Sequence, residues 1–187
     1  MATTISELSG FLDAHDVKHS TQDDATIVTG FGGLDHYRDA DGQPHIGLVI
    51  RIEEEGEYVK VFAPNAYSVT LEDVGPVLQA CAMIQWRTKL VQFEYDASDG
   101  ELRPIVEFPL EDAPMTSRQL MRCVSGLVSL VDHFHPVLSR ALADGDIVFE
   151  DGPPDSEIDM LGRLLGGFSP EVLAEALRRA DVHRRRN

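Results

Sequence analysis

The sequence predicts an α+β fold in which an antiparallel β-sheet is covered by helices and is followed by a helical extension. Two pairs of short segments alternate apolar and polar residues and are joined by turns, which is typical of β-hairpins. Amphipathic segments with helical spacing precede, separate and follow these hairpins. The expected order of helix, three strands, helix, two strands and helix favours an antiparallel sheet over the regular strand-helix alternation of a parallel one.

The 187 residues divide into a main domain and an appendage. Because 43% of the residues are hydrophobic, the chain can bury one sizeable core. We expect residues 1–149 to form the α+β domain and residues 150–187 to form a linker and a helical C-terminal extension. Gly152, Pro153 and Pro154 indicate the linker, and Ser169 before Pro170 indicates the start of the last helix.

The first helix is expected to begin at a capping box. Thr4 and Glu7 have the spacing at which a hydroxyl and a carboxylate accept hydrogen bonds from the backbone N–H groups at a helix start. The residues that follow form one apolar face, made of Ile5, Leu8, Phe11 and Leu12. We therefore expect this helix to pack on the core.

Three strands are expected next. Residues 26–29 are mostly β-branched and are followed by a glycine-rich segment that can end a strand. Residues 46–52 place a large apolar side chain at every second position, and residues 58–62 alternate in the same way after a reversal at residues 55–57. These two segments predict a hairpin.

A second helix is expected from Pro76, because the first turn of a helix tolerates a residue that has no backbone N–H. The apolar residues of this helix are Val77, Leu78, Cys81, Ile84 and Trp86. Trp86 is the largest apolar side chain of the set, so we expect it to pack in the core, with a place in an interface as the alternative.

A second hairpin and a long helix complete the domain. In residues 91–95 and 102–110, large apolar side chains mostly recur at every second position. Gly100 lies between the two segments and can adopt the positive φ of a tight turn. Thr116 and Gln119 form another capping box, and Pro136 is expected to kink or divide the helix that follows, which ends near Gly145. Apolar residues recur along this helix every three or four positions, at Leu120, Val124, Leu127, Val131, Phe134 and Leu138.

The charge of the chain argues against two classes of partner. The formal net charge is −16, and residues 1–150 hold 25 Asp and Glu against 10 Lys and Arg. Nucleic-acid phosphates and anionic membranes would repel such a domain, so we expect neither as a partner. The N-terminus lacks the pattern of a secretory signal and no apolar run is long enough to span a bilayer, so we expect a cytoplasmic protein in which Cys81 and Cys123 are free thiols.

No group of residues matches an established catalytic or metal-binding pattern, so we expect no enzymatic activity, no cofactor and no metal. Residues 29–33 are glycine-rich but lack the Lys and the hydroxyl residue that end a phosphate-binding loop. The loop from Asp35 to His45 holds several carboxylates and imidazoles, yet its spacing does not match an EF-hand. His133 and His135 are about 200° apart on a helix, which prevents joint chelation, and we expect both at the surface.

The order of elements resembles the type III secretion chaperone-like fold, and specifically its YbjN-like branch, a group of bacterial proteins described as sensory-transduction regulators. The resemblance spans about residues 4–142. It is carried by the hairpin of residues 46–52 and 58–62, by the hairpin of residues 90–95 and 102–110, and by the helix that holds Leu120, Leu127 and Val131.

The resemblance implies a function without catalysis. Members of this fold look like small, acidic, dimeric proteins that bind segments of client proteins on apolar surfaces of sheet and helices. Dimerisation in the secretion chaperones mostly uses the second helix. Transferred to this chain, the resemblance makes one set of residues candidates for a partner or dimer interface: Val77, Leu78, Cys81, Ile84 and Trp86.

Three hypotheses for the function follow. The first is a cytosolic, non-catalytic protein-binding module, expected to be a homodimer, that chaperones or regulates an unidentified protein partner. The second is a small-molecule or divalent-metal-dependent sensor or enzyme that uses the loop from Asp35 to His45. The third is an acidic mimic of nucleic acid that blocks a nucleic-acid-binding protein.

Overall fold

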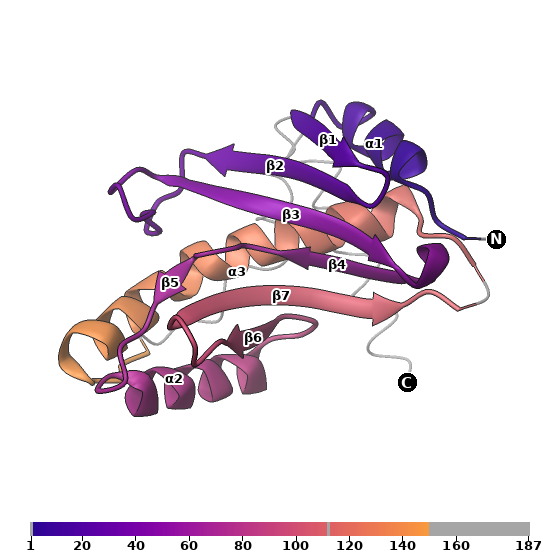
Figure 1. Cartoon of the computed structure of the whole chain (residues 1–187). Helices are drawn as coiled ribbons and strands as arrows, with labels where there is room; N and C mark the ends of the chain where they lie inside the picture. The colour runs from indigo at the N-terminus through magenta and orange to yellow at the C-terminus, as the bar shows by residue number, and fades with distance from the viewer. Residues whose placement is uncertain (1, 112, 150–187) are drawn as a thin grey trace, which may run out of the picture. The chain divides into compact units, whose positions relative to one another are not determined.

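The structure, a computed structural model, describes residues 2–111 and 113–149, and these form seven β-strands and three α-helices (Figure 1). All strand pairs are antiparallel and belong to one sheet. The predicted α+β fold, an antiparallel sheet covered by helices, is therefore confirmed. The linker and the helical extension expected at residues 150–187 lie outside the described residues.

Helix α1 (Ile5–Asp13) begins at the predicted capping box. The Thr4 hydroxyl accepts a hydrogen bond from the Glu7 N–H at 3.3 Å, and the Glu7 carboxylate accepts one from the Thr4 N–H at 2.9 Å. Ile5, Leu8 and Leu12 are buried, as the periodicity of the apolar residues predicts.

Strands β2 (Thr26–Gly32), β3 (His45–Glu53) and β4 (Tyr58–Phe62) are the three predicted strands. Ile27 pairs with Ile50, and Ile50 pairs with Val61, so three buried side chains lie next to one another on one face of the sheet. The short 3₁₀ turn η1 (Glu54–Gly56) follows β3 and leads into β4.

Two further strands precede the second helix, so the expectation of three strands there is incomplete. Strand β1 (His19–Asp23) pairs with β2 at one edge of the sheet, and most of its residues are exposed. An edge strand with two exposed faces does not need alternating apolar residues, which is why its sequence is polar. Strand β5 (Tyr67–Ser68) has two residues, too few to give a periodic pattern.

Strand β7 (Glu101–Pro109) connects the two halves of the sheet. On β7, Ile105 pairs with both β4 and β6 (Gln92–Tyr95), and Leu102 pairs with both β5 and β6. Strands β4 and β5 therefore follow one another along one side of β7, and β6 occupies the other side. The hairpin of β6 and β7 turns at Gly100, which has a φ of 81°, as predicted.

The helices cover one face of the sheet. Helix α3 (Ser117–Asp144) packs against β4 and β7 and also contacts α1 and α2 (Val74–Arg87). Figure 1 shows α3 crossing behind the strands, so the described helices leave the opposite face of the sheet uncovered. The core between these two layers holds the largest fully buried side chains, among them Leu8, Leu12, Leu48, Ile84, Leu120, Leu127 and Leu138.

Helix α3 continues through Pro136. Of the two expected effects of this proline, a kink or a division of the helix, the division is therefore wrong. The helix begins at the predicted capping box of Thr116 and Gln119 and runs to Gly145, whose φ of 73° ends it. Proline removes one backbone hydrogen bond from a helix, but most helical stability in a folded protein comes from packing of the apolar face. The long buried face of α3 therefore carries the helix past Pro136.

The N-terminal segment ties η1 to the start of α3. The Thr3 N–H donates a hydrogen bond to the carbonyl oxygen of Gly56 at 3.0 Å, and the Thr3 hydroxyl accepts one from the Met115 N–H at 2.7 Å. Thr3 is buried, and η1 has positive φ angles at Glu54, Glu55 and Gly56. We call this arrangement the N-terminal clasp.

Candidate functional site

Helix α2 separates the five residues predicted for an interface into two groups. Val77, Cys81 and Ile84 are buried in the core of the protein itself. Leu78 is 40% exposed and Trp86 is 88% exposed. Only Leu78 and Trp86 of the five are therefore accessible to another molecule in this structure.

The expectation that Trp86 packs in the core is wrong, and helix geometry gives the reason. Successive residues of an α-helix are about 100° apart, so residues three and four positions apart share a face and residues two positions apart do not. The spacing of Val77, Cys81 and Ile84 sets the buried face. Trp86 follows Ile84 by two positions, about 200° around the helix, and its side chain is exposed.

Exposed apolar and small residues follow one another along the outer side of α2 and its flanking turns. We call them the α2 surface: Leu71, Gly75, Leu78, Ala82, Trp86 and Leu90. Gly75, Leu78, Ala82 and Trp86 recur every three or four positions within α2, the spacing of one helix face. Leu71 and Leu90 lie in the segments that flank the helix. Charged residues lie at the two ends, with Glu72 and Asp73 at the N-terminal end and Arg87 and Lys89 at the C-terminal end.

The loop from Asp35 to His45 is organised by its own hydrogen bonds. The Asp39 carboxylate accepts hydrogen bonds from the N–H groups of Asp41 and Gln43 and lies 3.1 Å from His45 Nδ1. The hydrogen bond from Gln43, with a further one from His45, lowers the pKa of Asp39. Among residues 2–111 and 113–149, no group of three or more His, Cys, Asp or Glu side chains is arranged to hold a metal ion, so this geometry does not favour the metal-dependent hypothesis.

Asp132 is a structural anchor that the sequence did not reveal. Its carboxylate accepts hydrogen bonds from three consecutive backbone N–H groups, at 3.2 Å from Asp35 and 2.8 Å from both His36 and Tyr37. Asp132 is on α3, so it fixes the loop after β2 to the long helix. The two partners are about a hundred positions apart in sequence, and no local pattern identifies such a contact.

A cluster of three aromatic rings lies next to this anchor. His135 stacks on Tyr67 at 5.9 Å between ring centroids and meets the edge of Tyr37 at 5.2 Å. Its ring nitrogens lie 3.3 Å from the Tyr67 hydroxyl and 3.0 Å from the Ser139 hydroxyl. His133 is exposed as expected, but His135 is half-buried, so the expectation that both histidines are surface groups is wrong for His135.

We expect His135 to make the protein less stable in mild acid. Burial lowers the pKa of His135 below its ordinary value of 6.5, with a smaller opposing effect of Asp132 and smaller lowering effects of Arg38 and His36. Since the unfolded chain then binds the proton more tightly than the folded one, the free energy of unfolding falls as the pH drops below about 6.5. Urea unfolding at pH 7.5 and pH 5.5 measures this loss.

The matched control is the His135→Asn variant, which cannot titrate. It should lose less stability between the two pH values than the unmodified protein does, because the other six histidines are common to both. An equal loss in the two proteins would contradict the assignment of this pH dependence to His135.

The remaining candidate residues do not converge on a reactive centre. Cys81 and Cys123 are free and buried, and burial raises the pKa of the first thiol to about 12 and of the second to about 11, so neither is an activated nucleophile. The glycine-rich residues 29–33 belong mostly to β2, where they pair with β3 and do not open a helix. This placement does not suit a phosphate-binding loop.

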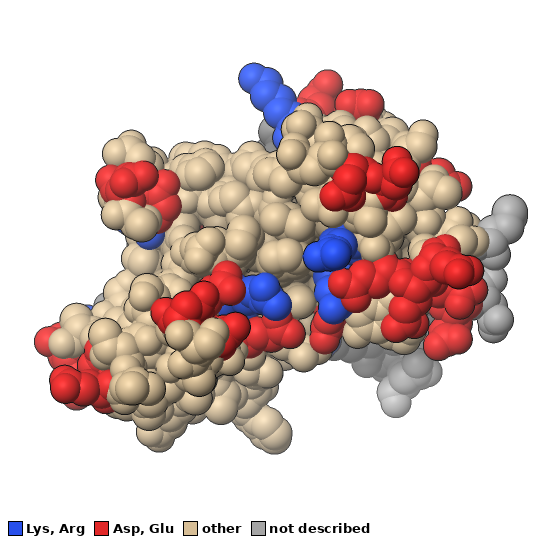
Figure 2. Space-filling view, viewed as in Figure 1, with Lys and Arg blue, Asp and Glu red and all other residues tan. Residues whose placement is uncertain are grey.

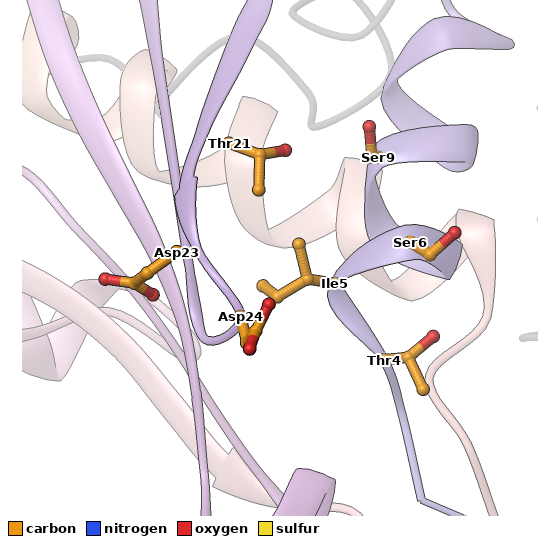
Figure 3. Close-up of a pocket in the computed structure, with 7 residues that line it drawn as sticks. All are labelled: Thr4, Ile5, Ser6, Ser9, Thr21, Asp23 and Asp24. Atoms are coloured by element: carbon orange, nitrogen blue, oxygen red, sulfur yellow. The ribbon is translucent and has the colours of Figure 1, made fainter.

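A shallow pocket of about 460 Å³ lies between α1 and the turn that joins β1 to β2. Figure 3 shows that Ile5 projects into its middle, that Thr21 and Asp24 lie across from α1, and that Asp23 points away. The Asp23 carboxylate accepts a hydrogen bond from the Ala25 N–H at 2.8 Å, which lowers its pKa and serves the turn. The pocket is open and its polar groups do not converge, unlike those of a typical ligand site.

The described residues contain no helix that is both long and apolar enough to cross a membrane. No protein-family model and no curated protein matches the chain.

Solved structures with low sequence identity do match. One is the crystal structure of YbjN from E. coli, whose sequence is 13% identical to this chain. The match covers 73% of this chain and 90% of the YbjN chain, with a TM-score of 0.51. The HopA1-SchA chaperone-effector complex is 13% identical over 66% of this chain and 85% of its own, with a TM-score of 0.44. The ExsC-ExsE complex is 14% identical over 74% of this chain and 97% of its own, with a TM-score of 0.47. The chain thus shares the fold of YbjN, and the YbjN-like α+β fold that its sequence predicts is confirmed.

Proposed function

We propose that this protein is a non-catalytic, cytosolic protein-binding module that acts as a homodimer and chaperones or regulates a partner protein. The observation that carries the proposal is the exposure of large apolar side chains on the α2 surface, where Trp86 is 88% exposed and Leu71 is 79% exposed. Contiguous apolar surface of this kind marks interaction sites in proteins, and exposed tryptophans are frequent anchors of interfaces.

The chemistry of the described residues supports binding more than turnover. The polar side chains that lie together serve structural purposes: Asp132 holds a loop and Asp39 closes a turn. The two buried thiols support a cytosolic location, since a reducing compartment keeps cysteines unpaired.

The charges beside the α2 surface support pairing with a second copy of the chain. A symmetric dimer whose two-fold axis is perpendicular to α2 places this helix of both protomers side by side in opposite directions. In that arrangement, Glu72 and Asp73 of one protomer lie near Arg87 and Lys89 of its partner. Gly75 and Ala82 are small, so they let the two helices approach closely.

We expect the Trp86→Glu variant to be a monomer at concentrations where the unmodified protein is a dimer. The substitution replaces a large apolar side chain of the proposed contact with a negative charge, which in the antiparallel pair lies near Glu72 and Asp73 of the partner protomer, and it should leave the fold intact because the side chain is exposed. Size-exclusion chromatography with light scattering gives the mass of both proteins. Val28→Glu is the control, because it charges an exposed apolar residue on the sheet. A monomeric unmodified protein, or a dimeric Trp86 variant, would contradict the proposed dimer.

The binding function itself is tested by affinity capture of the tagged full-length chain from a native lysate, followed by mass spectrometry. We expect one partner to be recovered in stoichiometric amount. Repeated recovery of the protein alone would contradict a chaperone or regulatory role.

A further inference from the structure

Two neighbouring side chains of α3 hold two separate segments of the protein. Asp132 accepts hydrogen bonds from backbone N–H groups of the loop between β2 and β3, residues 33–44, and His135 contacts Tyr67 of β5. Side chains three positions apart lie on one face of a helix, so both contacts come from one turn of α3. We call the side chains of Asp132 and His135 the α3 latch.

The backbone of this turn lacks one hydrogen bond. Pro136 directly follows His135 and has no N–H group, so it cannot donate to the carbonyl oxygen of Asp132, four positions back. Proline is a common place for a helix to bend. The α3 latch therefore lies on a turn of the helix that is easily distorted.

The segment that His135 holds, residues 66–73, connects the sheet to α2. Strand β5 contributes two residues to the sheet, both paired with β7, and the Val69 N–H donates to the carbonyl oxygen of Gly100 at 2.8 Å. Because these backbone hydrogen bonds are few, the side-chain contact with His135 has a large share in holding the segment.

The loop between β2 and β3 depends on the latch in a similar way. It projects from the sheet and has acidic side chains, Asp39 and Asp41, near its tip (Figures 1 and 2). Tyr37 joins this loop to the segment before α2: its N–H donates to Asp132 at 2.8 Å, and its hydroxyl donates to the carbonyl oxygen of Ala66 at 3.0 Å. A change at the α3 latch therefore acts on both segments.

Protonation of His135 removes the hydrogen-bond acceptor that faces Tyr67 at 3.3 Å. A neutral imidazole has one nitrogen that accepts, whereas a protonated imidazole donates from both nitrogens. Tyr67 is buried, and burial raises its pKa well above the ordinary value, so its hydroxyl keeps its proton. A buried donor that loses its acceptor is destabilising. The Ser139 hydroxyl, 3.0 Å from the other ring nitrogen, is partly exposed and can turn its proton to water.

The charged groups around His135 come from α3 and from the loop between β2 and β3. Burial has the largest effect and lowers the pKa of His135, Asp132 opposes it, and Arg38 and His36 add to it. Other titratable groups on the elements packed here keep their protons because burial raises their pKa values: Tyr37, Tyr67 and Cys81.

A protonated His135 is attracted to Asp132 on the same face of α3. The Asp132 carboxylate already accepts hydrogen bonds from three backbone N–H groups of the loop. A cation beside this carboxylate competes with those N–H groups. One proton thus weakens both contacts of the latch.

We propose that the α3 latch is an acid-sensitive switch, in which protonation of His135 releases residues 66–73 from α3 and weakens the hold of Asp132 on the loop between β2 and β3. The inference goes beyond the proposed binding function and holds for the protein without a partner. Leu71 of the α2 surface lies in the released segment, so acid changes one end of that surface.

The test is amide hydrogen exchange of the full-length protein at pH 7.5 and pH 5.5, read by mass spectrometry and corrected for the intrinsic effect of pH on exchange. In the opened segment His135 has its ordinary pKa of 6.5, so at pH 5.5 one histidine increases opening by at most about tenfold. We expect the protection of residues 66–73 to fall about three- to tenfold. The protection of β6, on the other side of β7, should change less.

The decisive variant is His135→Phe, which keeps an aromatic ring against Tyr37 and Tyr67 but cannot bind a proton. We expect equal protection of residues 66–73 at the two pH values. His15→Gln is the matched control, because it removes an exposed histidine that contacts Ser117 at the start of α3, and it should keep the full response.

A second variant, Tyr67→Phe, keeps His135 and removes the hydroxyl that loses its acceptor. Its response to pH should be smaller than that of the unmodified protein. The proposal is overturned by any of three results: no response in the unmodified protein, an equal loss of protection in residues 66–73 and β6, or a full response in His135→Phe or Tyr67→Phe. None of these results depends on a dimer or a partner, so the proposed function is judged separately by mass and by affinity capture.

Discussion

The Gly56→Ala variant is expected to lose about 3 kcal/mol of unfolding free energy, because the new methyl group would collide with the N-terminal clasp. A Cβ atom at Gly56 would lie 2.3 Å from the carbonyl oxygen of Thr3 and 3.0 Å from the Thr3 nitrogen. The φ of 93° at Gly56 is itself unfavourable for alanine. Relief of the collision requires the Thr3 segment to move, which breaks its hydrogen bond to Gly56. Chemical denaturation monitored by circular dichroism measures the loss.

The Gly33→Ala variant separates the collision with Thr3 from the cost of a positive φ. Gly33 has a φ of 76°, but an added Cβ atom would meet nothing within 4 Å. Only the cost of the backbone conformation remains, so the expected loss of unfolding free energy is about 1 kcal/mol. Similar losses in the two variants would show that the clasp adds nothing to the effect. Gly47→Ala, with neither a positive φ nor a close neighbour, should be close to neutral or slightly stabilising.

Leu127→Ala is expected to destabilise the protein by about 3 kcal/mol, since it leaves a cavity in the middle of the core. Leu127 is fully buried on α3, the helix that packs against β4 and β7. The loss comes from the hydrophobic free energy of the removed carbons and from the contacts that the surrounding side chains cannot regain. The same denaturation experiment measures it.

Val148→Ala provides the comparison, because Val148 is 45% exposed and lies beyond the end of α3. Its removal should change the free energy of unfolding by less than about 0.5 kcal/mol. A loss for Leu127→Ala as small as that for Val148→Ala would mean that α3 is not packed as the structure describes.

The fold was predictable where local chemistry and periodic burial agree. Thr4 with Glu7 and Thr116 with Gln119 identify both capping boxes from residue types at a fixed spacing. Strands β3 and β4 have one face against the core, so their side chains alternate in a way that the sequence displays. Strand β1 has no such signal, because an exposed edge strand is held by backbone pairing to β2.

The candidate site was predictable only in part. The α2 helix was found, but the size of Trp86 suggested burial, whereas its angular position relative to Cys81 and Ile84 gives the correct, exposed side. His135 could not be placed from sequence, since Tyr37 and Tyr67 reach it from distant strands and loops. The side-by-side position of Val28, Val49, Phe62 and Ile105 follows from the registers of four strands, which no single segment contains.

The position of α3 at the end of the domain has a consequence for the order in which the chain folds. The strands β2, β3 and β4 are complete by Phe62, yet the helix that covers their apolar side begins only at Ser117. After the ribosome has synthesised β2, β3 and β4, it must therefore add more than fifty further residues before that side can be shielded from water. Nascent chains at this stage expose Ile27, Ile50 and Val61 together, and such exposed strand surfaces are prone to aggregate or to recruit cellular chaperones. The domain that we propose binds a partner protein would thus itself pass through a stage at which it depends on protection by others.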